Sequence, residues 1–562
     1  MLVLGVHSGW ADAGATVFDD YTLLAAVPLA RLTGMPHDGG RLPVEAIAEC
    51  LDIAGLRADE IGALSLSHGV FPGRYYSHLS LPRRLGRGLR QFFGRDTPIS
   101  LSDETRRHAE GNSRPGESLL DLPALLDDLG LNRNIAVHFH RDHDAQALLA
   151  LNETGWDNGL IFTADEQGCS ARVLKYGRLA TLYDDETDPA MAGALSPGRL
   201  LGLGVDALGL PDAATLFALA GHGEPVLGQA LLAHLKVDEA GRVQADFSAE
   251  GGPQRWLRRL VEDQPPALVA SSLQFALTAL FGQAITTLMR RHELRHLALG
   301  GSLFADPRLV HMVAQAAQPD SLGLYPRVSN AALPLGGVLD LLLQRDGFDI
   351  WRQRHKPLAG MAWGRDYAAD IDPVLGNAGC RLVSHDPVRA AAALLNAGKL
   401  VACYDGRAIG ADGAAARVVV FNGGIAGAAA LANQRLERPG WLPPVVYVAR
   451  VGLGLLCPGL DVAQAQGGIA ALPAPRWRDA LGSGLLPDGL LVPVAVDPQD
   501  QPLLADLLAA YANLTELPVL LGLPLQAGFA PPADAPAEAL QLLQDGRIDY
   551  IVTASAVWER GA

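Results

Sequence analysis

Short apolar runs alternate with longer stretches rich in Ala and Leu along most of this chain. The apolar runs have the length and composition of strands, and the Ala/Leu-rich stretches are long enough to form helices. This alternation is typical of α/β proteins, in which helices cover the faces of a sheet. The expected strands of a first series lie at residues 1–6, 15–18, 135–138, 160–163, 172–174 and 296–299.

A second series of apolar runs begins near residue 400, with Gly- and Pro-rich turns and fewer long helices between the runs. Between the two series, residues 353–372 mix polar residues with Pro and Trp. A chain of 562 residues is also several times longer than a usual domain. We therefore predict an α/β domain at 1–355, a linker at 356–385 and a second α/β domain at 386–562.

The charge balance excludes several classes of function. The chain has 45 Lys and Arg against 61 Asp and Glu, a net charge of −16, which argues against a nucleic-acid or anionic-membrane partner. Five scattered cysteines form no C-x-x-C pair, so we expect a reducing, cytoplasmic location. The most apolar window, 267–289, is interrupted by Ser, Gln and Thr and predicts a buried helix. Oligomeric state stays open, with a homodimer as one alternative.

A cluster of imidazoles is the first candidate site. His138, His140 and His143 lie within six residues, and Asp165 follows the next expected strand. Imidazole and carboxylate groups that converge from strand ends are ligands for iron, zinc or manganese. Position 139 is Phe, however, so no H-x-x-x-H pair ends at His143. The alternative is that these histidines cap helices or bond to the backbone.

Gly300 and Gly301 form the second candidate site, because they follow the expected strand 296–299 and precede a helix. Backbone N–H groups at such a position can bind a phosphate. The alternative is that the two glycines only shape a turn. The chain contains no G-x-S-x-G elbow, no Walker lysine loop and no H-E-x-x-H motif, so none of those sites is predicted.

Taken in order, several segments resemble the motifs of the NodU/CmcH/TobZ carbamoyltransferase family over nearly the whole chain. Residues 11–18 (ADAGATVF) resemble the family's HDASAALV, and 165–168 (DEQG) its DGxG. In the second half, 406–417 occupies the place of GRxEFGPRALGxR, one residue shorter. Further similar segments are 143–147, 215–225, 300–301, 330–337, 441–443 and 521–526.

The resemblance implies a fold and an activity. The fold would be a two-lobed ASKHA domain (actin/hexokinase/TsaD-like) followed by a YrdC-like α/β domain. The YrdC-like domain of active members makes a carbamoyl-adenylate from carbamoyl phosphate and ATP with Mg²⁺. The TsaD-like domain, holding a metal ion (Fe²⁺ by resemblance), passes the carbamoyl group to a hydroxyl of a small molecule or sugar.

The polar chemistry of the motifs departs from the family. Two positions expected to hold the metal are Phe139 and Asn330, whereas His143 and Asp165 remain. A phenyl ring and an amide cannot replace an imidazole and a carboxylate around a divalent cation. In the C-terminal half Arg407 and Arg417 persist, whereas other motif positions have become Ala408 or Ile409, Ala411, Asp412 and Leu442. Replacing Arg by Asp inverts the field that would hold an anionic substrate.

We therefore expect a non-catalytic family member that acts with, or regulates, an active carbamoyltransferase, with no metal or cofactor. The alternative is a divergent O-carbamoyltransferase whose metal is held by His138 or His140 with His143 and Asp165. A third hypothesis is a sugar-kinase-like ATPase. The expected remnant of a ligand cleft is lined by Asp12, His140, His143, Asp165, Gly300, Gly301 and Asn330.

Several of these residues also have a purely structural interpretation. Asp165 and Asn330 could cap helices at strand ends. Cofactor binding, if any, is assigned to Gly300, Gly301, Arg407 and Arg417. The alternative for the two arginines is an ion pair with Asp405 or Asp412.

Overall fold

The computed structural model describes residues 1–76, 98–109, 119–188, 195–325, 330–358, 361–409 and 417–561. By its internal contacts the chain divides into two units. Unit 1 comprises 1–155, 187–192 and 329–358, and unit 2 comprises 156–186, 193–328 and 359–562. Leu358, the last residue of unit 1, lies within the region where a linker is expected. The division into domains at 1–355 and 386–562 stays a prediction.

Unit 1 is built on a five-stranded sheet in the order β3-β2-β1-β4-β7. The central strand β1 pairs antiparallel with β2 on one side and parallel with β4 on the other, and β4 is parallel to β7. The carboxyl ends of β1, β4 and β7 therefore meet at one edge. The strands are β1 (Leu2–His7), β2 (Gly14–Asp19), β3 (Thr22–Pro28), β4 (Ala63–Ser67) and β7 (Ala136–His140).

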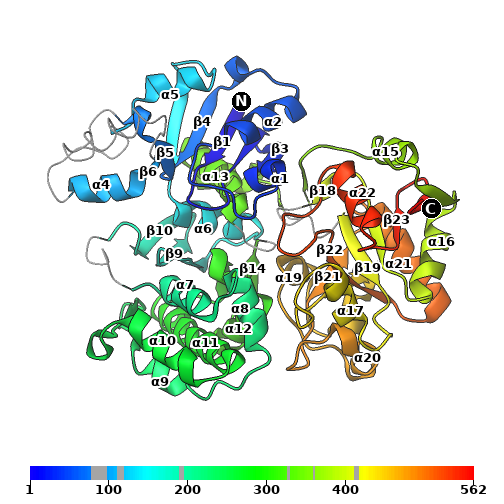
Figure 1. Ribbon diagram of the computed structural model, residues 1–562. Coiled ribbons are helices and arrows are strands. Elements are labelled where there is room, and N and C mark those ends of the chain that lie inside the picture. Colours follow the sequence, from blue (N-terminus) through cyan, green and yellow to red (C-terminus); the bar gives the residue numbers. More distant parts are fainter. Residues whose placement is uncertain are drawn as a thin grey trace. The chain divides into compact units, whose positions relative to one another are not determined.

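Helices cover both faces of this sheet, as the alternating sequence pattern predicts (Figure 1). Leu4 and Val6 of β1 belong to the apolar core shared with α2 (Val44–Ala54). On the other face, Gly5 lets α13 approach so closely that a Cβ there would lie 2.5 Å from the Pro334 carbonyl oxygen. Other helices of unit 1 are α1 (Leu29–Thr33), α4 (Leu101–Ala109), α5 (Leu122–Asp128), α6 (Asp142–Asn152), α13 (Leu333–Asp346) and α14 (Phe348–Arg354), and a two-stranded sheet pairs β5 (Val70–Pro72) with β6 (Pro98–Ser100).

Unit 2 begins with a second five-stranded sheet, in the order β10-β9-β8-β13-β14. Its central strand β8 is antiparallel to β9 and parallel to β13, so the strand order and directions of the unit 1 sheet are repeated. This duplicated arrangement is the one expected for an ASKHA-like domain. The strands are β8 (Gly159–Ala164), β9 (Cys169–Lys175), β10 (Arg178–Asp184), β13 (His296–Gly300) and β14 (Ser321–Leu324).

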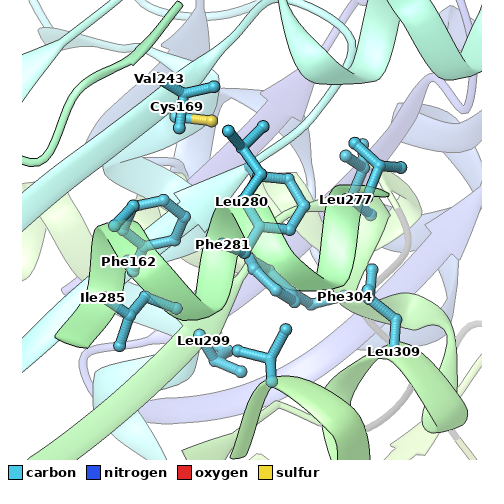
Figure 2. Packing of buried hydrophobic residues seen from close by; sticks show 14 of the residues in the cluster. Phe162, Cys169, Val243, Leu277, Leu280, Phe281, Ile285, Leu299, Phe304 and Leu309 are labelled. Carbon is cyan, nitrogen blue, oxygen red and sulfur yellow. The ribbon is translucent and has the colours of Figure 1, made fainter. Parts of the chain in front are cut away.

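The long helix α11 (Pro266–Arg291) fills the core against this sheet. It is long and apolar enough to span a membrane, but 78% of its most apolar window is buried inside the protein. Phe281 of α11 packs against Phe162 of β8 and against Phe304, with ring centroids 5.9 and 5.4 Å apart (Figure 2). The buried helix expected at 267–289 is thus confirmed. The surrounding helices are α7 (Pro197–Leu208), α8 (Ala213–Ala220), α9 (Gly228–Leu232), α10 (Pro253–Asp263) and α12 (Pro307–Ala317), and β11 (Leu235–Val237) pairs with β12 (Val243–Ala245).

The C-terminal part of unit 2 contains an eight-stranded mixed sheet in the order β16-β24-β23-β17-β19-β22-β20-β21. One apolar core includes α16 and α21, and a second includes α15, α17 and α22. The strands are β16 (Arg381–Ser384), β17 (Val401–Tyr404), β19 (Arg417–Phe421), β20 (Val445–Ala449), β21 (Pro493–Val496), β22 (Val519–Pro524), β23 (Tyr550–Val552) and β24 (Val557–Glu559). The helices are α15 (Ile371–Asn377), α16 (Pro387–Asn396), α17 (Ala428–Arg435), α18 (Leu453–Leu456), α19 (Val462–Gly467), α20 (Pro475–Arg478), α21 (Pro502–Thr515) and α22 (Pro536–Gln544), and a hairpin pairs β15 (Ala362–Trp363) with β18 (Ala408–Ile409).

Candidate functional site

Polar side chains gather at the carboxyl edge of the unit 1 sheet. His7 ends β1, Ser67 ends β4 and His140 ends β7, and all three are at most 2% exposed. His143, which is fully buried, follows in the first turn of α6. In open α/β sheets ligands bind at the carboxyl ends of the strands. This edge is therefore the candidate site of unit 1.

His138 is engaged by α13. Its Nε2 lies 2.7 Å from Oδ2 of Asp340, and the two side chains are only 18% and 10% exposed. Gln344, one turn further along α13, donates from Nε2 to the same carboxylate. The bond ties β7 to α13 through a carboxylate, which is neither a helix cap nor a bond to the backbone, so the role of His138 stays a prediction.

His140 is held in one tautomer by Ser65. Ser65 Oγ lies 2.7 Å from the carbonyl oxygen of Gly337 and 2.9 Å from His140 Nδ1. A hydroxyl has one proton, which Ser65 donates to the carbonyl, so Ser65 must accept the bond from the Nδ1–H of His140. Burial, together with neighbouring His7, lowers the pKa of His140 well below its usual value. The ring is therefore neutral, and its Nε2 carries a lone pair.

That lone pair faces no hydrogen-bond partner among the described residues. His140 Nε2, His7 Nδ1 and Ser8 Oγ are all buried polar atoms without such a bond. Oδ1 of Asp142 lies 3.7 Å from His7 Nδ1. Sequence reasoning missed His7 and Ser8; the available signal was a polar pair that directly follows an apolar strand.

Phe139 lies on the opposite face of β7 from His138 and His140, because side chains alternate along a strand. It packs against the apolar core of unit 1 and presents its ring edge-on to His68, with centroids 5.6 Å apart. Burial lowers the pKa of His68 to about 4, with Arg141 nearby acting in the same direction. The side chain at position 139 is thus a partly buried ring at the edge of the core.

Asp12 and Asn330 are the other predicted site residues in unit 1. Asp12 lies in the β1–β2 loop with a positive φ of 53°, and its Oδ1 bonds to Nδ1 of His37 at 2.9 Å. Asn330 opens a short 3-10 turn, Asn330–Ala332, directly before α13. In α13 the residue before the first helical position is Ala332, so Asn330 is not its N-cap.

Asp165 belongs to the β8–β9 turn in unit 2. Its Oδ1 accepts from the backbone N–H groups of Gln167 (2.7 Å) and Gly168 (3.2 Å). Gly198 of α7 packs so closely on this turn that a Cβ there would lie 2.1 Å from the Asp165 carbonyl oxygen. The sequence offered helix capping as the structural role of Asp165. The carboxylate does accept bonds from backbone N–H groups, but those groups belong to a tight turn and not to a helix.

Gly300 ends β13, and Gly301 follows it with a φ of +95°. A Cβ on Gly301 would lie 2.2 Å from the carbonyl oxygen of Ala164, at the end of the neighbouring strand. Glycine is therefore required here by the backbone itself. The close contact with Ala164 by itself explains why position 301 is glycine, without a phosphate-binding role.

A buried ion pair in the unit 2 sheet was not predicted. Nη2 of Arg172 lies 3.1 Å from Oδ2 of Asp184, and the two side chains are 3% and 5% exposed. Arg172 also bonds to the hydroxyl of Ser170. A basic residue inside an apolar strand was the signal in the sequence, since such a residue is rarely buried without a partner.

Arg417 is fully buried at the start of β19. Its terminal nitrogens donate to the carbonyl oxygens of Asp534 (2.5 Å) and Gly406 (2.6 Å), and the guanidinium pairs with the Asp534 carboxylate. It also lies 4.7 Å from the centroid of the Tyr404 ring. These contacts tie the start of β19 to the end of β17 and to the segment before α22.

Arg407 donates from Nε to the carbonyl oxygen of Gly364 at 2.8 Å. Arg417 forms an ion pair with Asp534, a partner that the sequence did not predict. Ala411 and Asp412 lie outside the described residues.

The predicted cleft draws its residues from both units. Asp12, His140, His143 and Asn330 belong to unit 1, and Asp165, Gly300 and Gly301 to unit 2. Within unit 1, the structure brings His140 and His143 to the same sheet edge. The cleft as a whole, and its use by a cofactor, stay predictions.

Comparison with known proteins adds little to this picture. No family model matches the chain. Solved structures that superpose on it include a ROK hexokinase from Thermus thermophilus (18% identity, 62% of this chain and 100% of that chain, TM-score 0.32). Others are the (R)-2-hydroxyglutaryl-CoA dehydratase component A of Acidaminococcus fermentans (11%, 61% and 97%, 0.33) and a ROK family protein from Streptococcus pneumoniae in complex with sucrose (12%, 62% and 99%, 0.32). Superpositions this loose carry no argument, and the ASKHA-like architecture rests on the duplicated strand order.

Proposed function

We propose that this chain is a carbamoyltransferase-like protein that has lost catalysis and acts with, or regulates, an active carbamoyltransferase. The observation that carries the proposal is the state of β7. The side chain at position 139 is a partly buried phenyl ring packed against the apolar core, and the imidazoles on either side of it are bonded within the fold, His138 through Nε2 to Asp340 and His140 through Nδ1 to Ser65. A metal ligand needs a lone pair directed at the ion, which Phe139 lacks and His138 does not offer at Nε2. Of these three side chains His140 alone has its Nε2 without a hydrogen-bond partner among the described residues, so β7 supplies one such nitrogen where the family motif has more ligands.

The C-terminal part supports the same proposal. A site for carbamoyl phosphate and ATP must present cationic groups to the ligand. Arg417 keeps its guanidinium inside the protein, with its terminal nitrogens bonded to Asp534 and Gly406. The Arg417 guanidinium therefore holds segments of the fold together, and its bonded nitrogens are not presented to a ligand.

The direct test is an assay of the full chain with carbamoyl phosphate, ATP and Mg²⁺. We expect no AMP or pyrophosphate release above a blank that lacks carbamoyl phosphate. Release that depends on carbamoyl phosphate would overturn the proposal in favour of a divergent O-carbamoyltransferase. ADP and phosphate release without carbamoyl phosphate would instead favour an ATPase.

A metal measurement on the purified chain separates the same hypotheses. We expect Fe, Zn and Mn well below one equivalent per chain. A stoichiometric metal that is lost in His140→Ala but kept in His138→Gln would support the alternative with relocated ligands. His140 is the histidine expected to matter, because its Nε2 has no hydrogen-bond partner among the described residues, whereas the Nε2 of His138 bonds to Asp340.

A further inference from the structure

A polar cavity lies at the amino edge of the unit 2 sheet. Strand β13 begins at His296 and β14 at Ser321, and the loops that lead into these two strands line the cavity together with the ends of α11 and α12. Its volume is about 370 Å³, within the range of small-molecule sites, roughly 300 to 1,000 Å³. Gly300 lies at the opposite end of β13, so this cavity is separate from the candidate site.

Charges of both signs line this cavity. Arg290 and Arg295 supply two guanidinium groups, and Glu293 and Asp320 supply two carboxylates. Arg295 and Asp320 form an exposed ion pair with a distance of 3.5 Å between Nη1 and Oδ2. Among the described residues, none forms a hydrogen bond or an ion pair with the side chain of Arg290 or Glu293. One cation and one anion of the lining are therefore available to a ligand.

The remainder of the lining is largely apolar. Met289 near the end of α11 and Leu294 in the following loop are buried side chains that border the cavity. Ala316 and Ala317, in the last turn of α12, add two small apolar groups. An apolar group that covers these side chains is removed from water, which favours its binding.

Two helices end at the cavity. Helix α11 ends at Arg291 and α12 at Ala317. The last carbonyl groups of a helix carry a partial negative charge, which favours a cation close to them. The two helix ends therefore act in the same direction as Glu293, whereas Arg290 favours an anionic group.

We propose that this cavity binds a free α-amino acid with an apolar side chain. The ligand's carboxylate pairs with Arg290, its ammonium group pairs with Glu293, and its side chain covers Met289 and Leu294. A ligand with a single charge matches the lining less well, because the two carboxylates repel an anion and the two guanidinium groups repel a cation. The proposal does not depend on whether the protein is catalytic, since binding here needs no carbamoyl substrate.

Saturation-transfer NMR of the full chain with L-leucine is the test. Isocaproate is leucine without the amino group, and isopentylamine is leucine without the carboxylate, so these two ligands are matched comparisons. We expect a dissociation constant for L-leucine on the order of millimolar, because pairs of exposed charges contribute little. Isocaproate and isopentylamine should each bind at least about threefold more weakly.

Two variants assign the charges of the ligand to the lining. Arg290→Gln should weaken L-leucine and isocaproate by about threefold and leave isopentylamine unchanged. Glu293→Gln should weaken L-leucine and isopentylamine by a similar factor, without weakening isocaproate. Both side chains are exposed, so neither change removes a core contact. The matched control is Arg258→Gln, at an exposed arginine of α10 that does not line the cavity, which should leave all three ligands unchanged.

Several outcomes would overturn the proposal. One is an absence of saturation transfer to L-leucine at about ten times the expected dissociation constant. A second is isocaproate or isopentylamine binding as tightly as L-leucine, because one charge would then suffice. A third is an equal loss of L-leucine binding in Arg258→Gln and Arg290→Gln. Circular dichroism of each variant shows whether a loss of binding reflects loss of fold.

Discussion

Two five-stranded sheets in this chain, one in each unit, run through the same order of strands. In each, two antiparallel strands lie on one side of a central strand and two parallel strands on the other. The unit 1 sheet ends in imidazoles, of which His138 bonds to Asp340 of α13 and the neutral His140 to Ser65 of β4. The unit 2 sheet buries an ion pair, Arg172 with Asp184, and a carboxylate-capped turn.

The difference teaches that a repeated strand order does not decide which polar groups a sheet face can bury. Burial in unit 1 keeps His140 and His68 uncharged, as their lowered pKa values indicate. In the unit 2 sheet, Arg172 and Asp184 are buried as a pair of opposite charges. A buried neutral group and a buried ion pair respond differently to substitution and to pH, so the contrast can be tested.

The largest effect is expected at the ion pair. Arg172→Met removes the guanidinium that faces the Asp184 carboxylate, which is 5% exposed. Loss of one partner of a buried pair typically costs about 3 to 5 kcal/mol. Urea unfolding should show a loss of this size, whereas Arg178→Met, at an exposed position of β10, should change stability by less than about 0.5 kcal/mol. A loss below about 1 kcal/mol for Arg172→Met would show that the pair does not hold this sheet.

Next come two glycines at close backbone contacts. Gly301→Ala places a Cβ 2.2 Å from a carbonyl oxygen at a φ of +95°, and we expect a loss of about 2 to 4 kcal/mol from clash and strain together. Gly337→Ala meets the ring of His140, which can move, so a smaller loss of about 1 to 3 kcal/mol is expected. Gly202→Ala, which has open space, is the control and should be neutral or stabilising. Equal losses at 301 and 337 would contradict the distinction between backbone and side-chain contacts.

Two groups, His68 in unit 1 and Asp306 in unit 2, should contribute to the pH dependence of stability with opposite signs. His68 has a folded pKa of about 4, below the usual 6.5 of the unfolded chain. Between pH 6.5 and about 4 the His68 imidazole is protonated in the unfolded chain but not in the folded one. The free energy of unfolding therefore falls as pH falls, by at most about 3 kcal/mol. In unit 2, burial raises the pKa of Asp306 to about 6, above 3.8. There the folded chain holds the extra proton, and stability from this group is lost as pH rises from 3.8 towards 6.

Thermal unfolding from pH 4.5 to 6.5 separates the two contributions. His68→Gln should gain in Tm relative to wild type as pH falls, and Asp306→Asn should gain as pH rises. Asparagine keeps the N-cap that Asp306 provides for α12, so that comparison isolates the charge. Differences from wild type that do not change with pH would contradict both assignments.

How far the sequence reaches can be judged from particular residues. The strands expected at 296–299 and 160–163 are β13 (His296–Gly300) and β8 (Gly159–Ala164), and the other strands expected in the first series agree within a few residues, because period and apolar runs are local signals. The hydrogen bond from Ser65 to the Gly337 carbonyl joins residues that are 272 apart in the sequence, and no local sequence pattern can predict it. The same holds for Arg417 and Asp534, 117 residues apart.

Only part of the candidate site was predicted: His140 and His143 were named, whereas His7, Ser8, Ser67 and the bonds of the site were not. The motif comparison singled out His138, His140 and Phe139, yet it could not tell that the first two face α13. Whether these two histidines face α13 depends on which face of β7 the helix covers. The pairing of β7 with β4 and the packing of β7 on α13 determine that face. Whether the residues of the two units form one cleft remains a prediction.

The smallest effect is expected at the hydroxyl that fixes the His140 tautomer. Ser65→Ala removes the acceptor of the Nδ1–H and the donor to the Gly337 carbonyl, which costs about 1 to 2 kcal/mol as in other buried neutral hydrogen bonds. The sharper measurement is the ¹⁵N chemical shift of the His140 ring, which should report a protonated Nδ1 in the wild type and a changed tautomer in Ser65→Ala. Ser196→Ala, which removes the N-cap of α7 in unit 2, has a similar energetic cost of about 1 kcal/mol but should leave the His140 spectrum unchanged. A wild-type ring protonated on Nε2 would contradict this assignment. Ser65 would then donate its proton to Nδ1 of His140, and the ring would have no lone pair left for another ligand.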